Sequence, residues 1–347
     1  MKNLLILNVD ENIDKANKII SNINKDLFIL YLNNNIFNRN SKYKLLDDFF
    51  RPEYASKIDK AIRNLTKTWY NSIKNELKYF EINLPELIQN ELLKLWPIFL
   101  KIEILARLIK KEKFPNIYII TEYDEDIRIV KEIIKNKNIE LNYDLLKKSD
   151  KKPINIIFKN FSYKIIAKLQ NTLFKFYLLK EKSNNNILFL GNLRLTLPIF
   201  KKLKENKNNI LIRGGENLGR GLFTKYTDYY ITFKEFSTSK IKTKVKEEKR
   251  KLFNKWNKIR SNNKKLNLYY KIPLFDILEP NLRKIFLEYF VKLIKYIEVM
   301  KYIGNKVDVV VTHNDVILFE KTIIKSANNL NIPTLTMIEG FLPIKQI

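Results

Sequence analysis

The stretch VDVVVTHNDVILFEKTIIKSANNLNIPTLTMIEGF, residues 307–341, contains a complete strand–helix–strand unit. Residues 307–312 form an apolar run of the kind found in strands that are buried on both faces. Apolar residues then recur at helical spacing over 316–330, and a second apolar run follows at 334–338. Because parallel strands are joined by helical crossovers, this pattern predicts an α/β fold with a Rossmann-like parallel sheet flanked by helices.

The same alternation of strand and helix occurs elsewhere in the chain. Residues 3–9 and 27–32 are predicted strands that enclose a helix, and residues 116–121 resume the sheet. A second series begins with predicted strands at 187–190 and 210–213. We therefore expect two lobes of one layered α/β domain.

Three regions follow from these patterns. Residues 1–150 form the first part, and their stretch 43–111 has a helical pattern that predicts an insertion beside the sheet. Residues 151–182 predict an amphipathic connecting helix, and residues 183–347 form the second part.

The connecting helix carries apolar and basic residues at helical spacing. It is interpreted as a surface helix packed on the core, while a helix lying on an anionic membrane remains the alternative. Its predicted apolar side comprises Phe158, Phe161, Ile165, Leu169, Phe176 and Leu179, and the lysines that recur elsewhere on it are Lys164, Lys168 and Lys175.

Composition limits the function classes. The 347 residues carry a net charge of +28, but only 11 of the 65 basic residues are Arg. Lys, Asn and Ile are the residues that an AT-rich genome favours, and a surface poor in Arg argues against nucleic-acid readout. Cys is absent, which excludes disulfides and thiolate metal sites. No apolar stretch is long enough to span a membrane, so we expect a cytoplasmic protein, soluble or peripheral on the inner face of the cell membrane.

Ligands of open α/β sheets bind beyond the carboxyl ends of the parallel strands. Residues 213–221 follow such a strand and hold four of the seven glycines. Glycines allow backbone amides to approach a phosphate and Arg can pair with it, although the spacing is neither a P-loop nor GxGxxG. A turn that needs positive φ explains the glycines equally well. The predicted substrate-binding residues are Gly191, Asn192, Arg194, Arg213, Gly214, Gly215, Asn314 and Gly340.

His313, Asp315 and Glu339 are the candidate catalytic residues, because they follow the last two predicted strands. As His313 is the only histidine, no cluster of histidines can bind a metal, and we predict no metal site. Asp315 could simply cap a helix, whereas Glu339 could act as a base toward a hydroxyl. The acidic turn at 122–126 is assigned no chemistry, because acids at a helix N-terminus complement its dipole.

Residues 307–341 resemble the end of the N-terminal domain of GT-B glycosyltransferases of surface-polysaccharide synthesis. In that family a D-V-V-V strand, a polar loop, a helix and an I-P-T strand lead to a His-Gly or Glu-Gly turn. The stretch is also similar to UDP-N-acetylglucosamine 2-epimerases, whose H-G-D loop and E-A-G turn correspond to His313-Asn314-Asp315 and Glu339-Gly340.

The resemblance implies transfer of a sugar from a nucleotide-sugar, used as co-substrate without a bound cofactor, to a polysaccharide or lipid-linked acceptor. Asp315 or Glu339 would be the base, and His313 a hydrogen-bond donor. GT-B enzymes bind the donor mostly through a C-terminal domain, so the resemblance implies that this chain is the acceptor half and that the donor domain is absent. An epimerase-like enzyme is the second hypothesis, and a non-enzymatic basic module that binds RNA or an anionic membrane is the third.

Overall fold

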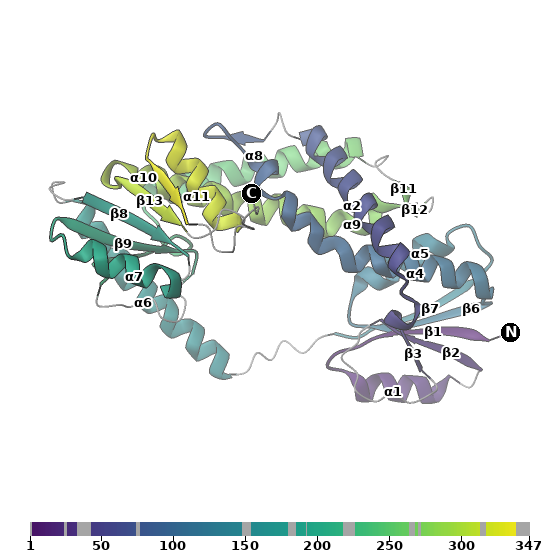
Figure 1. Ribbon diagram of the computed structural model, residues 1–347. Helices are drawn as coiled ribbons and strands as arrows, with labels where there is room; N and C mark the ends of the chain where they lie inside the picture. The colour runs from purple at the N-terminus through teal and green to yellow at the C-terminus, as the bar shows by residue number, and fades with distance from the viewer. Residues whose placement is uncertain are drawn as a thin grey trace, which may run out of the picture. The chain divides into compact units, whose positions relative to one another are not determined.

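The computed structural model describes residues 2–23, 26–32, 43–73, 77–147, 154–179, 185–191, 193–217, 226–263, 268–269, 272–312 and 317–337. The chain forms two compact units, each with its own five-stranded sheet (Figure 1). The first unit comprises Met1–Ser72, Gln89–Lys151 and Ile259–Leu282. The second comprises Ile73–Ile88, Lys152–Lys258 and Arg283–Ile347.

The first sheet has the order β3-β2-β1-β6-β7, and all its strands are parallel. Its central strand β1 is buried along its whole length, as its run of Leu and Ile predicts. The chain turns from one direction of winding to the other between β1 and β6, which makes their carboxyl ends the switch point of the sheet. The strands are β1 (Asn3–Asn8), β2 (Leu27–Tyr31), β3 (Tyr43–Leu45), β6 (Asn116–Thr121) and β7 (Glu140–Leu145).

Helices cover this sheet. Helix α4, which has nine buried residues, begins at Trp96 with Pro97 in its first turn, a position where a missing N–H costs nothing. The helices of the first unit are α1 (Ile13–Asn22), η1 (Leu46–Phe49), α2 (Pro52–Ile73), η2 (Gln89–Leu95), α4 (Trp96–Glu112), α5 (Asp124–Ile134) and α9 (Leu274–Lys284), and a short hairpin joins β11 (Leu268–Tyr269) to β12 (Ile272–Pro273).

The stretch predicted as a helical insertion, residues 43–111, is helical only in part. Its first residues form the edge strand β3, because Tyr43 and Leu45 pair in register with Ile29 and Tyr31. The hairpin of β4 (Lys78–Tyr79) and β5 (Ile82–Asn83), followed by α3 (Leu84–Leu87), belongs to the second unit. Periodicity alone does not detect strands of two or three residues.

The second sheet has the order β10-β9-β8-β13-β14 and is also parallel. Numbered within each sheet, both orders are third, second, first, fourth and fifth, so the two units share one Rossmann-like arrangement. The parallel α/β fold predicted from the sequence is confirmed, but it occurs as two separate sheets. The strands are β8 (Asn185–Leu190), β9 (Asn209–Gly215), β10 (Tyr229–Thr232), β13 (Val309–Thr312) and β14 (Thr334–Thr336).

An aromatic cluster joins the second sheet to its helices. Phe319 lies edge-on to Phe233 and to Tyr296, with ring centroids 5.2 Å apart in each pair. The helices are α6 (Ile154–Leu178), α7 (Leu193–Lys204), α8 (Ser239–Asn263), η3 (Ile285–Tyr289), α10 (Phe290–Ile303), η4 (Gly304–Lys306) and α11 (Leu318–Asn329). Helix α8 ends in the first unit, and the segment α9–η3–α10 continues from the first unit into the second.

The helix α6 packs on the core, but through a face that the sequence did not single out. Ala167, Asn171 and Phe174 are its buried residues. The side predicted to be apolar carries exposed side chains at Ile165, Leu169, Phe176 and Leu179, while the side chains of Phe158 and Phe161 lie outside the described residues. The predicted face is therefore wrong as a core contact, because the opposite side of the helix packs against β10.

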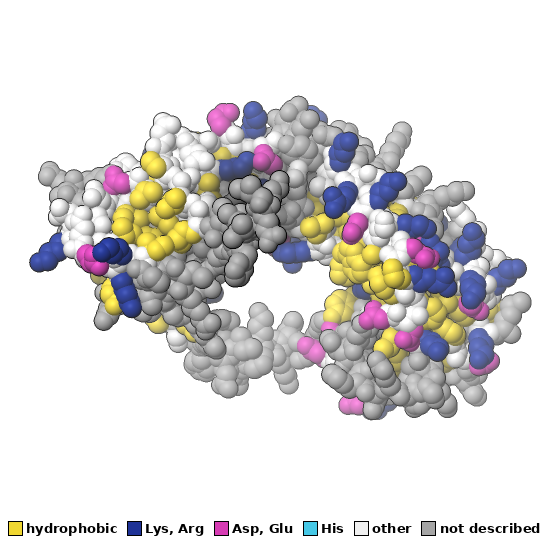
Figure 2. All heavy atoms as spheres, viewed as in Figure 1, with side chains coloured by type: hydrophobic (Ala, Val, Ile, Leu, Met, Phe, Trp, Pro, Cys, Tyr) yellow, Lys and Arg dark blue, Asp and Glu magenta, His cyan; other side chains and the backbone are white. Residues whose placement is uncertain are grey.

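Lys and Arg side chains are interspersed with hydrophobic and acidic ones on the face shown in Figure 2. Among the helices that the structure describes, none combines the length and the apolar character needed to cross a membrane.

Candidate functional site

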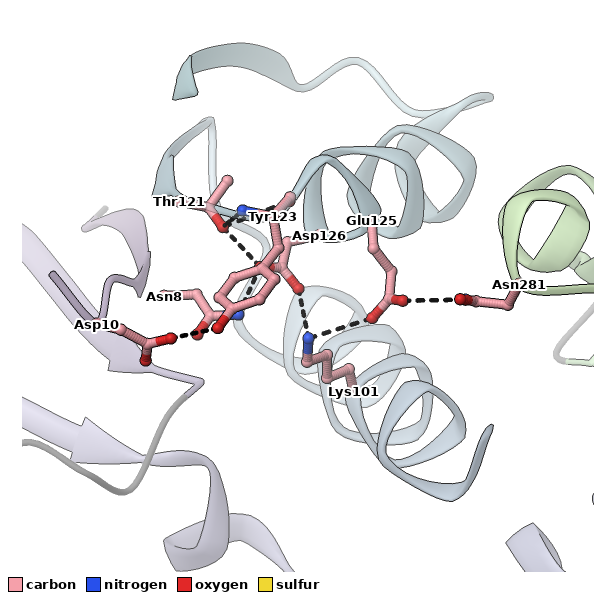
Figure 3. A network of polar contacts seen from close by, with 8 residues as sticks. All are labelled: Asn8, Asp10, Lys101, Thr121, Tyr123, Glu125, Asp126 and Asn281. Atoms are coloured by element: carbon pink, nitrogen blue, oxygen red, sulfur yellow. Dashed lines mark hydrogen bonds and ion pairs between the residues drawn. The ribbon is translucent and has the colours of Figure 1, made fainter. Parts of the chain in front are cut away.

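The switch point of the first unit holds a buried network of polar side chains (Figure 3). Asp126, in the first turn of α5, is fully buried. It accepts hydrogen bonds from Lys101 Nζ at 2.7 Å, Asn8 Nδ2 at 2.6 Å and Thr121 Oγ1 at 2.7 Å. Asn8 and Thr121 are the last residues of β1 and β6, and they are partners in the strand register. One carboxylate therefore ties both strand ends to α4 and α5.

Glu125 extends this network towards α9. Its carboxylate lies 3.3 Å from Lys101 Nζ and accepts a hydrogen bond from Asn281 Nδ2 at 3.3 Å. Burial by itself lowers the pKa of Lys101, but the charges of Asp126 and Glu125 outweigh it and raise that pKa above its usual 10.5. The ammonium is therefore a permanent structural charge at neutral pH.

Glu122 fills the loop that follows β1. Its carboxylate accepts hydrogen bonds from the backbone N–H groups of Asp10, Glu11 and Asn12 at 3.2, 3.0 and 2.9 Å, and from Asn12 Nδ2 at 2.7 Å. In nucleotide-binding sheets, amides at this position cradle a phosphate. Here the protein supplies its own anion, so the loop is closed to an external one.

These contacts correct the interpretation of residues 122–126 as acids that only complement a helix dipole. Asp124, Glu125 and Asp126 do lie in the first turn of α5. Asp126 nevertheless forms a buried ion pair with Lys101, and the Glu122 carboxylate accepts backbone hydrogen bonds from the loop after β1. The sequence pattern could not distinguish these roles, because the hydrogen-bond partners of Glu122 lie more than 100 positions away from it in the sequence.

Stability should fall in acid because of Glu122. Burial raises the pKa of this carboxyl, but the hydrogen bonds from Asn12, Glu11 and Asp10 outweigh it and bring the pKa below its usual 4.5. A lowered pKa contributes stability above pH 4.5 that is lost as the pH falls through the folded-state value. We expect Glu122→Gln to weaken this acid dependence in urea unfolding between pH 7 and about 3. Asp14→Asn, an exposed change on α1, should leave it intact.

The carboxyl ends of β8 and β9 in the second unit have a different chemistry. Arg213, on β9, is only 6% exposed, and its Nη2 lies 3.4 Å from the carbonyl oxygen of Gly191 at the end of β8. Burial lowers the pKa of Arg213, and the neighbouring Tyr230 opposes this effect. A guanidinium held at the carboxyl ends of parallel strands is placed to attract an anion.

No known protein family, characterised protein or solved structure matches this chain. Functional assignment therefore depends on the residues and their geometry. In the part of the chain that the structure covers, no group of three or more His, Cys, Asp or Glu side chains could hold a metal ion.

Different physical causes explain why glycine occupies each of three positions in the second unit. Gly191 has φ 96°, the left-handed conformation that favours glycine. Gly214 and Gly215 instead lie in β9, where a Cβ on Gly214 would meet Leu190 Cδ2 at 2.8 Å and a Cβ on Gly215 would meet Tyr230 Oη at 2.5 Å. Close packing explains these two glycines, so the hypothesis of a positive-φ turn is wrong for them.

Of the predicted site residues, the structure brings together Gly191 and Arg213, with Gly214 beside them on β9. Arg194 lies in α7, and its side chain is outside the described part. Several predicted residues lie outside the described residues altogether: Asn192, His313, Asn314, Asp315, Glu339 and Gly340.

A pair near the second switch point was not predicted. Thr312, the last residue of β13, donates a hydrogen bond to Glu320 Oε2 at 3.1 Å, and both residues are buried. Thr121 and Asp126 form the same kind of pair at the end of β6. In each unit a threonine ends the strand that is fourth in chain order within its sheet, and an acidic residue follows in the next helix. This shared pattern is the sequence signal that could have identified both pairs.

Proposed function

We propose that this chain is a GT-B glycosyltransferase that moves a sugar from a nucleotide-sugar to a polysaccharide or lipid-linked acceptor, and that the second unit binds the phosphates of the donor. The observation that carries the proposal is the contrast between the carboxyl ends of the two sheets. In the first sheet Glu122 occupies the loop after β1, whereas in the second sheet Arg213 of β9 lies beside Gly191, which follows β8.

Two units of the same topology support a two-lobed enzyme. The two enzyme families that contain a segment similar to residues 307–341 have two Rossmann-like lobes and handle nucleotide-sugars. Each unit of this chain has a parallel sheet with the same strand order. A donor lobe and an acceptor lobe can therefore both be assigned within residues 1–347, which is a broader proposal than an acceptor half alone.

Electrostatics supports the assignment of the lobes. At the first switch point Glu125 and Asp126 pair with Lys101, and Glu122 occupies the neighbouring loop beside Asp10, which accepts a hydrogen bond from Tyr123. The exposed carboxylate of Asp10 repels phosphate, but it can accept hydrogen bonds from sugar hydroxyls. We assign the acceptor to the first unit and the nucleotide to the second.

The catalytic roles remain those implied by the resemblance. Asp315 or Glu339 would act as the base, and His313 would donate a hydrogen bond. No cofactor or metal is needed in this proposal, since the nucleotide-sugar is a co-substrate.

The proposal is tested by calorimetric titration of the full chain with UDP and with GDP. We expect one of them to bind, and Arg213→Lys to weaken its binding by about tenfold or more, because lysine cannot reproduce the planar fork of donors. Arg250→Lys, an exposed change on α8, is the matched control and should bind like the wild type.

Urea unfolding of the Arg213→Lys variant separates lost binding from lost folding. Failure of both nucleotides to bind the folded wild type would contradict donor binding by this chain and return the hypothesis to an acceptor half. Equal binding by Arg213→Lys and the wild type would remove Arg213 from the site.

A further inference from the structure

The helix α6 has two apolar faces. Ala167, Asn171 and Phe174 line the inner one, which packs against β10. Figure 1 shows that the N-terminal half of α6 extends past the sheet of its own unit. The inner face therefore accounts for only part of the apolar residues of this helix.

The opposite face is exposed. Because successive helical residues are about 100° apart, Ile165, Leu169 and Phe176 lie within about 40° of one another around the helix axis. Leucine and phenylalanine side chains in such a continuous row are unusual on a surface that meets only water. The exposed fractions are 52% for Ile165, 58% for Leu169, 49% for Leu173, 63% for Phe176 and 79% for Leu179.

The charges on α6 are of one sign. Its 25 residues include no Asp or Glu. Lys164 and Lys168 are exposed and lie along one flank of the apolar row, whereas Lys175 is turned towards the unit and donates to the backbone oxygen of Ser237. An apolar row flanked by lysines is complementary to an anionic lipid bilayer, because the apolar side chains can enter the acyl chains while the lysines contact the anionic headgroups.

We propose that the exposed face of α6, defined as Ile165, Leu169, Leu173, Phe176 and Leu179 with Lys164 and Lys168, docks on an anionic lipid bilayer. RNA would use the lysines but not the apolar row. A second copy of the chain would bring like charges together, which opposes pairing through this face. Lysine stems can lie along the apolar row while their ammonium groups reach the lipid phosphates.

The test is flotation of the full chain with vesicles of phosphatidylcholine alone or with phosphatidylglycerol added. We expect binding only to the anionic vesicles. Ile165→Ser, Leu169→Ser and Phe176→Ser combined should lower partitioning more than tenfold, since each removes apolar area from the bilayer. Lys164→Gln with Lys168→Gln should lower it roughly fivefold for each lysine, and more weakly in high salt.

The matched control is Leu93→Ser with Leu335→Ser, because these leucines are exposed to a similar degree away from α6. This control should float like the wild type. Circular dichroism and urea unfolding establish that each variant is folded. Nucleotide titration provides an independent readout, because substitutions on α6 should leave it unchanged whether or not the transferase proposal holds.

Three results would overturn the proposal. They are a folded wild type that floats with neither vesicle, a triple serine variant that floats like the wild type, and a control that loses binding equally. A lipid-free dimer in light scattering that the triple variant converts to a monomer would assign the face to a second copy instead.

Discussion

Asp126→Ala is expected to lower the free energy of unfolding of the first unit by about 3–5 kcal/mol, because removing one partner leaves a buried polar network without its acceptor. Three donors, Lys101, Asn8 and Thr121, point at this one carboxylate. Glu125 lies farther from the ammonium, at 3.3 Å, and cannot replace the lost contacts to the strand ends. Urea unfolding, with hydrogen exchange at β1 and β6, measures the effect.

Asp124→Ala on the same helix is the matched control. Its side chain is 58% exposed and pairs with Arg128, so the expected loss is about 0–1 kcal/mol. Similar losses in the two variants would mean that the buried network contributes no more than a surface ion pair. Lys101→Met with Asp126→Leu should recover only part of the stability lost in the single variant, because it removes both buried charges but leaves Asn8 and Thr121 without their acceptor.

Asn171→Ala is expected to destabilise the second unit by about 2–4 kcal/mol. The Asn171 side chain accepts from the backbone N–H of Thr232 at 2.9 Å and donates to its carbonyl oxygen at 3.2 Å. Thr232 ends β10, an edge strand, and both residues are buried. An orphaned buried N–H costs about 1–3 kcal/mol and the second lost bond about 1 kcal/mol.

Thr172→Ala, one position further along α6, is the control for Asn171→Ala. Thr172 is exposed and bonds only within the helix to the carbonyl oxygen of Lys168 among the contacts described, so a change of about 0.5 kcal/mol or less is expected. Unfolding followed by circular dichroism compares the two variants. A loss for Asn171→Ala as small as that of its neighbour would show that water replaces the side chain at this edge.

The central strands of both sheets could be predicted from apolar runs, because they are buried on both faces. The runs at 3–9 and 116–121 correspond to β1 and β6 within one residue. The edge strand β3 could not be predicted, since its three residues are held by pairing with β2 rather than by their own pattern. A proline does not always end a helix, since α9 begins at Leu274 and continues through Pro280.

The candidate site could be predicted only where a residue acts near its own strand end. Gly191 and Arg213 follow from the rule about carboxyl ends, and the structure places them together. Glu122 and Lys101 could not be assigned, because their roles depend on partners from other elements. In α6, helical periodicity identified an apolar face correctly, but it could not identify which of two such faces the sheet would cover.

The two units are interleaved along the chain, and this has a consequence for synthesis on the ribosome. The first unit needs Ile259–Leu282, which is translated only after most of the second unit. Its β1, β2 and β6 emerge early, but α9, which supplies Asn281, emerges late. The N-terminal sheet is therefore expected to remain incompletely covered during much of translation. Apolar surface that is exposed at this stage favours aggregation and engages chaperones.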